Sequence, residues 1–476
     1  MSNSYDIAII GAGPAGMSAA ITATKAGASV VVLDDKARPG GQIYRNVSNS
    51  PLQDPSALGI DYLKGKNLVD AFEQCPAEKF YKASVWHVGD NGEVLFSQNE
   101  TTNSLTAREL ILTCGAMERP FPIPGWHLPG VMSAGSAQVM LKSDGLVRDD
   151  AIFVGTGPLL YLIVTQYLRL GVRVKALVDT TPQAGYLNAM REFTSALSQP
   201  AMIGKGLALL NEIRRSGTPV YRFAHDLKIE GDQHATGLSF TAGGKAQQLS
   251  AEHIFLHQGV IPNLNMTRSL GLEHSWSEQQ LCWKPELDAW GQSSVDTIAV
   301  AGDVSGIVGA DGAERMGQLA ALQRLNRLGI ITESERDKQA TAARKQLKQL
   351  NHFRRFIDRL YRPQDDQRLP TQADTVICRC EEKTLAQLRE GFDQGACDPN
   401  ELKSLTRCGM GPCQGRQCGH TVSELLAKWR NEPVADVGYY RLRSPMRLLS
   451  LTELSQFNRL EPKIQSCRTT ATEESL

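Results

Sequence analysis

The chain opens with the stretch YDIAIIGAGPAG, residues 5–16, and this stretch decides the fold of its first part. The apolar run 5–10 predicts a buried strand, and the glycine pattern over 11–16 predicts a tight turn into a helix that ends near residue 26. A second apolar run, 29–33, predicts the next strand. Strand, turn, helix and strand in this order are typical of a mononucleotide-binding unit.

Three glycines in this turn carry the chemistry. Gly11, Gly13 and Gly16 satisfy G-x-G-x-x-G, in which missing side chains let the backbone approach a pyrophosphate and let the helix pack closely on the strand. Asp34 follows 23 positions after Gly11, where a carboxylate can accept hydrogen bonds from ribose hydroxyls. The glycine pattern alone is a weak signal, because glycine turns are common.

Three later segments strengthen this interpretation: RPGGQ at 38–42, LTCGAMERPFPIPG at 112–125 and TIAVAGDVSG at 297–306. Together with the first turn they resemble the glutathione-reductase-like flavoproteins, which contain two dinucleotide-binding domains. The resemblance implies an FAD cofactor. For Asp303 alone, a helix cap is the alternative to a flavin contact. The FAD residues that the resemblance implies are Gly11, Gly13, Pro14, Ala15, Gly16, Asp34, Asp35, Gly41, Gln42, Thr113, Gly115, Gly302 and Asp303.

A second copy of the pattern begins with AIFVGTGPLL at residue 151. Gly155 and Gly157 repeat the turn, but Leu160 stands at the third glycine position, which governs packing rather than phosphate approach. Asp179 lies where a ribose contact would sit and would repel the 2′-phosphate of NADP. The pattern therefore favours NAD or another adenine nucleotide over NADP, and leaves open whether the site binds any ligand.

Composition excludes several classes of protein. With 476 residues, the chain is long enough for two to four domains, and its 51 basic and 51 acidic residues give no net charge to attract nucleic acid. Hydrophobic residues make up 41% and charged residues 21%, as in folded globular proteins. The sequence shows neither a transmembrane segment nor a basic, apolar signal region at its start. We expect a cytoplasmic protein, which partners alone could bring to a membrane.

Six of the ten cysteines fall between residues 378 and 418. Outside this cluster, Cys75, Cys114 and Cys282 stand alone, whereas disulfide reductases of this family carry a closely spaced redox pair; the sequence thus argues against disulfide reduction. Thiolates on short glycine-rich loops, beside a flavin, favour a 2Fe-2S cluster. Zinc is the alternative.

The cysteine module resembles the bacterioferritin-associated ferredoxin-like domain, in which a C-x-C pair is followed by a second pair a little over thirty residues later. Cys378 and Cys380 form the first pair, and 32 residues separate Cys380 from Cys413. The resemblance thus implies Cys378, Cys380, Cys413 and Cys418 as ligands. Because four residues separate Cys413 from Cys418 where that domain often has two, Cys408 remains an alternative ligand.

These signals divide the chain into five parts and predict an α/β fold: two Rossmann-like dinucleotide-binding domains plus a small C-terminal 2Fe-2S domain of the bacterioferritin-associated ferredoxin type. Residues 333–361 lack Gly and Pro, and apolar residues recur at spacings of three and four, which predicts an amphipathic helix in the linker. The predicted parts are a discontinuous FAD domain (1–125 and 281–330), a second nucleotide domain (126–280), a helical linker (331–374), the 2Fe-2S domain (375–430) and a tail (431–476).

The whole combination, including ERPFPIPGW at 118–126 and GADGAERMGQLAAL at 309–322, is similar to the flavin and iron–sulfur subunits of heteromeric amine and imino-acid dehydrogenases. That family includes the opine oxidases, D-hydroxyproline dehydrogenase, hydrogen cyanide synthase and the α chain of sarcosine oxidase. The resemblance implies a partner β subunit with its own flavin that oxidises the amine, a small third subunit in some members, an FMN at a subunit interface in others, and a downstream electron acceptor.

Under that reading the chain transfers electrons and the residues that choose the amine lie on another polypeptide; no catalytic residue is identified here. Two alternatives stay open. The chain could be a self-sufficient NADH-dependent reductase of a protein acceptor, or a non-enzymatic redox-sensing scaffold.

Overall fold

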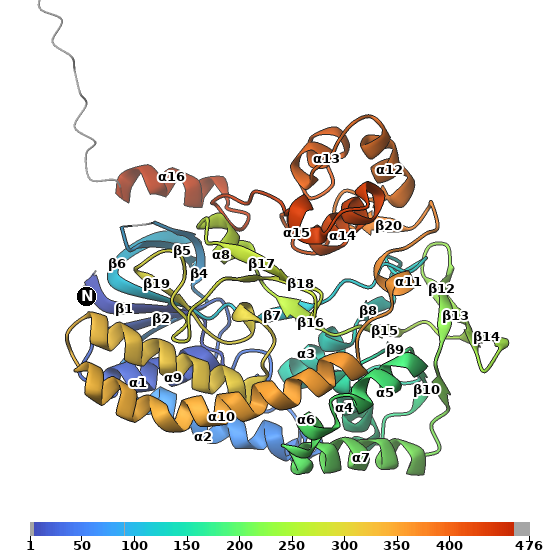
Figure 1. Ribbon diagram of the computed structural model, residues 1–476, viewed down its shortest axis with the longest axis horizontal. Helices are drawn as coiled ribbons and strands as arrows, with labels where there is room; N and C mark the ends of the chain where they lie inside the picture. Colours follow the sequence, from blue (N-terminus) through green and yellow to red (C-terminus); the bar gives the residue numbers. More distant parts are fainter. Residues whose placement is uncertain (1–3, 90, 461–476) are drawn as a thin grey trace, which may run out of the picture.

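A computed structural model describes residues 4–89 and 91–460 (Figure 1). Two sheets with helices packed around them form the main body, and a small, mostly helical module that includes α12–α15 lies beside it (Figure 1). Among the described residues, no helix combines the length and apolar character needed to cross a membrane.

The first sheet has the order β3-β2-β1-β6-β5-β4, and β19 pairs with the end of β6. β1, β2, β3, β6 and β19 run parallel, with Ile10 opposite both Leu33 and Leu112, and Leu112 opposite Val300. The chain therefore leaves four neighbouring strands at one edge of the sheet. The strands are β1 (Ser4–Ile10), β2 (Val30–Asp34), β3 (Glu78–Tyr81), β4 (Ser84–Val88), β5 (Glu93–Gln98), β6 (Thr101–Leu112) and β19 (Ile298–Val300).

Two strands, β7 (Ala116–Glu118) and β16 (Val260–Pro262), pair antiparallel where the chain passes between the first sheet and the second. The second sheet is parallel, with the order β11-β10-β9-β15-β8, and a three-stranded antiparallel sheet, β12-β13-β14, adjoins it. These strands are β8 (Val131–Ser133), β9 (Ala151–Gly155), β10 (Val174–Asp179), β11 (Val220–Arg222), β12 (His225–Gly231), β13 (Ala235–Ala242), β14 (Lys245–Ser250) and β15 (Ile254–His257).

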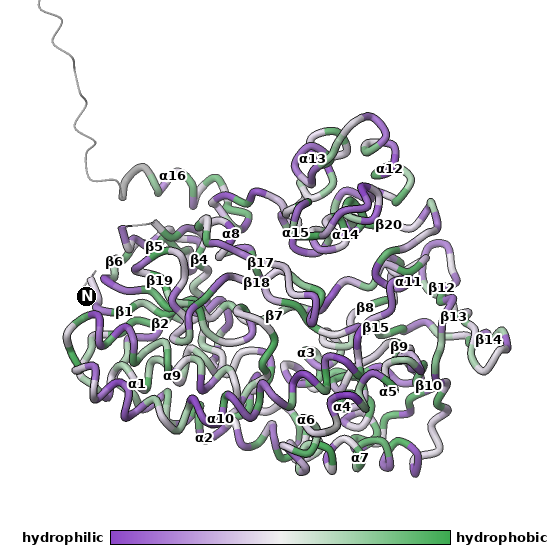
Figure 2. The backbone as a smooth tube through the Cα atoms, viewed as in Figure 1, coloured by the Kyte–Doolittle hydropathy of each residue, from purple (hydrophilic) through white to green (hydrophobic). Residues whose placement is uncertain are grey.

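Helices cover both sheets. α1 crosses α9 so closely that a Cβ added at Gly317 of α9 would lie 2.0 Å from the Ala15 carbonyl oxygen of α1. The predicted amphipathic helix is α10, which begins at a Thr332–Glu335 capping box and packs on α9, α5 and α6. Figure 2 shows long hydrophilic stretches along α10, as expected for a helix with one solvated side. These helices are α1 (Pro14–Lys25), α2 (Ile60–Gln74), α3 (Ala134–Asp144), α4 (Pro158–Arg169), α5 (Gln183–Met190), α6 (Phe193–Leu197), α7 (Pro200–Arg215), α9 (Ala310–Arg327) and α10 (Glu333–Leu360).

The remaining elements form the cysteine module and attach it to the body. The tail is docked through buried Tyr439 and Tyr440, and α16 lies on β6, where the Thr102 hydroxyl donates to the Glu453 carbonyl at 2.7 Å. Residues 461–476 of the predicted tail lie outside the described residues. The elements are α8 (Asn265–Ser269), β17 (His274–Ser277), β18 (Cys282–Pro285), α11 (Asp365–Arg368), β20 (Val376–Cys378), β21 (Lys383–Thr384), α12 (Leu385–Asp393), α13 (Pro399–Thr406), α14 (Gly419–Arg430), α15 (Val434–Val437) and α16 (Leu451–Leu460).

Candidate flavin and metal sites

The first candidate site lies where β1, β2, β6 and β19 end. Asp34 closes β2, and its carboxylate accepts the N–H groups of Ala12 at 2.6 Å and Lys36 at 2.7 Å. Burial raises the pKa of Asp34, and these two hydrogen bonds offset part of the effect. The Thr113 hydroxyl, at the end of β6, donates to the carbonyl oxygens of Ile10 and Gly11. The backbone turn of the G-x-G-x-x-G stretch is therefore fixed by both neighbouring strands.

The three glycines of this turn have different tasks. At Gly16, inside α1, an added Cβ would lie 1.9 Å from the Gly11 carbonyl oxygen, so only glycine allows this helix to pack on its strand. Gly11 has a φ of +110°, and a Cβ added there would lie 2.6 Å from the Thr113 carbonyl oxygen, so this position also excludes a side chain. At Gly13 the nearest atom to an added Cβ is the Gly41 Cα at 3.9 Å, so space remains over the start of α1. A pyrophosphate would use that space and the positive end of the helix dipole.

Asp303 has the helix-cap role that the sequence offered as one alternative, and its flavin contact stays a prediction. Its Oδ1 accepts the N–H groups of Val308 and Gly309, both at 2.9 Å, ahead of α9, and the residue also lines the cavity at this edge of the sheet. Gly302 has φ +83° and its added Cβ would lie 2.9 Å from the Ala15 Cβ, so this turn packs directly against the start of α1.

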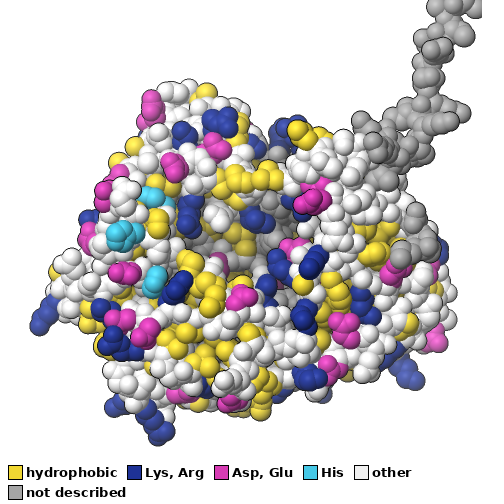
Figure 3. Space-filling view, turned by 180° about the vertical axis from the view of Figure 1, so that it is seen from behind, with side chains coloured by type: hydrophobic (Ala, Val, Ile, Leu, Met, Phe, Trp, Pro, Cys, Tyr) yellow, Lys and Arg dark blue, Asp and Glu magenta, His cyan; other side chains and the backbone are white. Residues whose placement is uncertain are grey.

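A cavity of about 1260 Å³ adjoins these residues. It is larger than the roughly 300–1,000 Å³ of ordinary ligand pockets, which gives room for a dinucleotide. Gly16 does not line it, in keeping with its packing role. Figure 3 shows a hollow on one face of the molecule, bordered by Lys and Arg side chains. The sequence-predicted flavin residues in the cavity wall are Gly11, Gly13, Pro14, Ala15, Asp34, Asp35, Gly41, Gln42, Thr113, Gly115, Gly302 and Asp303.

The second nucleotide unit has the predicted backbone but different surroundings. Gly155 and Gly157 are buried, and a Cβ added at Gly155 would lie 1.6 Å from the His257 carbonyl oxygen. The His257 ring lies beside Gly157, with its Nε2 3.2 Å from an added Cβ. Asp179 is 3% exposed, and its carboxylate accepts the Tyr161 hydroxyl at 2.8 Å and the Thr181 N–H at 2.9 Å. The carboxylate that the sequence predicts to bind a ribose therefore already has hydrogen-bond partners within the protein.

The linker covers this second unit. The Gln364 side chain donates to the Thr180 carbonyl at 3.0 Å, and the rings of Tyr361 and Tyr161 lie 6.1 Å apart. Burial raises the pKa of Asp179, since the charged form is the one that burial penalises. A separate cavity of about 500 Å³ reaches Asp179 and Arg222 from the side of α7.

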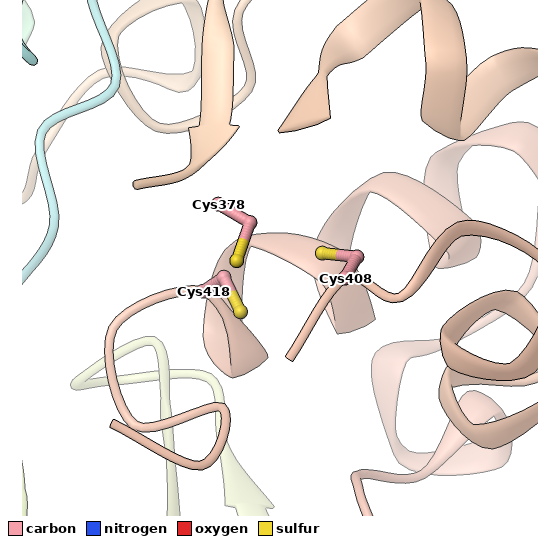
Figure 4. A group of neighbouring side chains, drawn as sticks. All are labelled: Cys378, Cys408 and Cys418. Carbon is pink, nitrogen blue, oxygen red and sulfur yellow. The ribbon is translucent and has the colours of Figure 1, made fainter. Parts of the chain in front are cut away.

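In the cysteine module, the sulfur atoms of Cys378, Cys408 and Cys418 lie within 4.8 Å of one another, and all three residues are buried. They come from the end of β20, the loop after α13 and the start of α14, and they point toward a common centre (Figure 4). Hydrogen bonds from the Cys408 and Cys418 thiols, with the N–H groups of Gly409 and Glu381, lower the pKa of Cys378 to about 2.

The other two candidate ligands, Cys380 and Cys413, are partly exposed and hydrogen bond to each other. Cys378 therefore faces two cysteines of the later segment, Cys408 and Cys418, whereas Cys380 faces Cys413. Cys408 joins the buried group as a fifth thiol. Cys397, the remaining cysteine of the module, is exposed.

The module closes over the flavin cavity. Arg379, between the two cysteines of C-x-C, lines that cavity and stacks over the Trp126 ring at 5.2 Å. The Trp126 Nε1–H donates to the Val376 carbonyl at 2.6 Å, and Arg416 of the later cysteine loop also lines the cavity. A single cavity therefore extends from the Gly11 turn to the loops that carry Cys378, Cys380, Cys413 and Cys418.

Comparison with known proteins agrees with this geometry. Residues 5–323 match the model of the family described as pyridine nucleotide-disulphide oxidoreductase. The chain belongs to this family. It is an FAD-dependent oxidoreductase, and the flavoprotein fold expected from the sequence is confirmed.

Two curated relatives resemble this oxidoreductase over most of their length. It is 40% identical to an opine oxidase subunit of Rhizobium meliloti over 461 residues, which cover 95% of this chain and 87% of the relative. It is 32% identical to hydrogen cyanide synthase subunit HcnB of Pseudomonas aeruginosa, covering 92% of this chain and 96% of that one.

Among solved structures, L-proline dehydrogenase from P. horikoshii has a TM-score of 0.69 at 17% identity, covering 95% of this oxidoreductase and 79% of that chain. Thioredoxin reductase from T. acidophilum has a TM-score of 0.50 at 21% identity, covering 69% and 100%. At these identities the likeness concerns the fold.

Sequence reasoning missed several residues of the oxidoreductase that line the cavity. Lys142 of α3 is buried there and donates to the carbonyl oxygens of Gln42 and Ile43, while burial lowers its pKa to about 7. Glu118 accepts the Gly135 N–H at 2.6 Å and bonds to the His257 ring at 2.8 Å. Both Glu118 and Trp126 belong to the ERPFPIPGW segment, which was noticed as a motif but given no role.

Proposed function

We propose that this oxidoreductase is the electron-transferring subunit of a heteromeric complex that oxidises an amino or imino acid of the opine, hydroxyproline, glycine or sarcosine type. The observation that carries the proposal is the shared cavity, in which the flavin cradle and the cysteine loops form parts of one wall. When bound, FAD accepts electrons in pairs and releases them singly, and a 2Fe-2S cluster carries one at a time.

The chain's own residues would hold the pyrophosphate of the flavin by backbone amides and its ribose by the carboxylate of Asp34. The amides at the start of α1 face the open space over Gly13, and Asp34 stands at the strand end where a ribose would bind. Lys142 is hydrogen bonded to the backbone of the Gln42–Ile43 loop, so it fixes the loop at the cavity wall. These contacts orient the flavin and restrict water around it.

For the cluster, we assign Cys378, Cys380, Cys413 and Cys418 as ligands, with Cys408 as the alternative. The arrangement supports a set with either Cys418 or Cys408 in the last place, because Cys378 faces both of these thiols and Cys380 faces Cys413. Four thiolates on two loops suit a two-iron cluster. The backbone N–H groups of Gly409 and Glu381 donate hydrogen bonds to Cys378, as amide groups commonly do to the ligand sulfurs of iron–sulfur clusters.

The second nucleotide unit supports a partner, rather than NADH, as the electron donor. Tyr161 and Thr181 already bond the carboxylate of Asp179, and Tyr361 and Gln364 of the linker contact the Tyr161 ring and the Thr180 carbonyl beside it. The curated relatives are named as subunits of oxidase and synthase complexes, which fits a partner that oxidises the amine with its own flavin. Oxidation there releases two electrons and two protons, and this chain would pass the electrons toward a downstream acceptor.

The test is to purify the chain with any co-expressed partner, count flavin and iron, and record visible spectra before and after adding candidate amines or NADH. We expect one flavin and about two irons per chain, with bleaching by an amine only when the partner is present. Bleaching of the isolated chain by NADH would overturn the proposal in favour of a self-sufficient reductase. Zinc in place of iron would show that the cysteine module holds no iron–sulfur cluster, and that part of the proposal would be wrong.

Four serine variants, compared in two pairs, identify the ligands. Cys413→Ser should lower the iron content, whereas Cys397→Ser, at the exposed cysteine of the same module, should leave it unchanged. Cys408→Ser compared with Cys418→Ser then decides the fourth ligand, because only replacement of the true ligand should remove iron.

A further inference from the structure

Tyr440, in the tail, is built into the cysteine loops. It is 2% exposed, and its ring lies against two glycines of the CGMGPCQGRQC segment. A Cβ added at Gly409 would lie 2.7 Å from the Tyr440 ring, and one added at Gly415 would lie 2.5 Å from it. Both glycines have positive φ, +90° and +77°, so a side chain at either position would be strained as well as crowded. These two glycines make room for this ring.

The hydroxyl of Tyr440 lies beside two cysteine sulfur atoms. The Tyr440 oxygen lies 3.5 Å from the Cys408 sulfur and 3.8 Å from the Cys418 sulfur, and its hydroxyl also reaches the Cys408 carbonyl oxygen at 3.1 Å. The hydroxyl has one proton to donate. Once Cys418 or Cys408 is an ionised ligand, its charged sulfur becomes an acceptor that competes with the neutral carbonyl.

We infer that the Tyr440 hydroxyl donates a hydrogen bond to a ligand sulfur of the cluster and thereby sets its reduction potential. The inference rests on the proposed function, since it needs a cluster at this site. It does not depend on which cysteine is the fourth ligand, because the hydroxyl lies beside both Cys408 and Cys418. Tyr440 is a positioning residue in this role: it acts on the cluster through the sulfur.

The direction of the effect follows from charge. Reduction adds one electron to the cluster and its sulfurs, so a hydrogen-bond donor stabilises the reduced form more than the oxidised form. Removing the donor should lower the potential. We expect Tyr440→Phe to disfavour reduction about tenfold, which for one electron corresponds to about 59 mV.

The experiment compares two tyrosines that are neighbours in the chain. Tyr440→Phe removes the hydroxyl and keeps the ring between Gly409 and Gly415. Tyr439→Phe is the matched control: Tyr439 is also buried, but its hydroxyl lies over Gly419, where an added Cβ would meet it at 2.3 Å. Both variants and the wild-type protein are loaded with iron anaerobically, iron is counted, and the potential is titrated with detection by electron paramagnetic resonance.

A lower potential in Tyr440→Phe alone, at wild-type iron content, supports the inference. An unchanged potential in Tyr440→Phe overturns it, as does a Tyr440→Phe protein that cannot be loaded while Tyr439→Phe can, since the hydroxyl would then have a structural role only. A wild-type protein that binds no iron even after anaerobic loading is a different failure: it removes the cluster of the proposed function, and this inference with it.

Discussion

Gly13→Ala separates flavin binding from folding. The residue has φ −77°, which alanine adopts freely, and the nearest atom to an added Cβ is the Gly41 Cα at 3.9 Å, an ordinary contact distance. Alanine is a poorer residue than glycine at the start of a helix, but it also restricts the unfolded chain. These effects oppose each other, so we expect the free energy of unfolding without flavin to change by less than about 1 kcal/mol.

Flavin binding should respond differently. If a pyrophosphate lies over Gly13, the added methyl group occupies its place, and overpacking of this kind costs about 1–3 kcal/mol. The flavin dissociation constant should therefore rise by roughly 5- to 150-fold. The assay removes the flavin, measures thermal unfolding of the apoprotein, and titrates FAD back with fluorescence detection.

The contrast is Gly16→Ala, in the same helix. Its added Cβ would lie 1.9 Å from the Gly11 carbonyl oxygen and 2.8 Å from the Thr113 hydroxyl oxygen, so this variant should destabilise the apoprotein itself. Wild-type flavin affinity in a folded Gly13→Ala protein would refute the placement of the pyrophosphate over Gly13, and with it the division of tasks among the three glycines.

Three further predictions concern stability and docking. Glu109→Gln removes one charge of the buried ion pair with Arg324, whose Nη1 lies 2.6 Å from the Glu109 Oε2. The free energy of unfolding in urea should fall by about 3–5 kcal/mol. The matched change in the exposed pair with Lys66, Asp70→Asn, should lower it by at most about 1 kcal/mol. Trp126→Phe leaves the Val376 carbonyl without its hydrogen-bond donor, so limited proteolysis should cut residues 363–374 of the linker faster. An unchanged rate would show that this hydrogen bond does not hold the cysteine module in place. For Lys142, the folded pKa of about 7 lies below the unfolded value, so the unfolded chain binds more protons between about pH 7 and 10 and stability should rise with pH there, by at most about 1.4 kcal/mol per pH unit. Lys142→Met should flatten this rise in urea unfolding at pH 7, 8 and 9, and equal slopes in the two proteins would contradict it.

Local pattern was sufficient to predict the first nucleotide unit. The strand, turn, helix and second strand lie within 30 residues of each other, and the position of Asp34 follows from their lengths alone. The amphipathic pattern likewise predicted α10 to within a residue of its end. These features depend on neighbours in the chain, which the sequence displays directly.

Features that depend on distant segments could not be predicted in this way. Spacing places Cys408 outside the ligand pairs, yet the turn after α13 brings its sulfur beside Cys378 and Cys418. The sequence shows only that the cysteine loops are rich in glycine, whereas in the structure the Tyr440 ring of the tail fills the space at Gly409 and Gly415. The contact of Tyr440 with these glycines could not be predicted from a repeating pattern in the tail, because a single buried residue forms no such pattern.

The two nucleotide units show why one pattern can have two outcomes. Both have the glycine turn and the acidic strand end, but a Cβ at Gly13 meets nothing closer than 3.9 Å, whereas at Gly157 the His257 ring is 3.2 Å away. Asp34 receives backbone N–H groups, which leave the space in front of the turn open, whereas Asp179 receives the Tyr161 hydroxyl. The sequence marks where a nucleotide could bind, and the side chains that arrive from β15, α4 and the linker decide whether room is left. That asymmetry supports the proposal that electrons enter through a partner protein rather than from a second nucleotide, since the open cavity beside Asp34 is the one that reaches the cysteine loops.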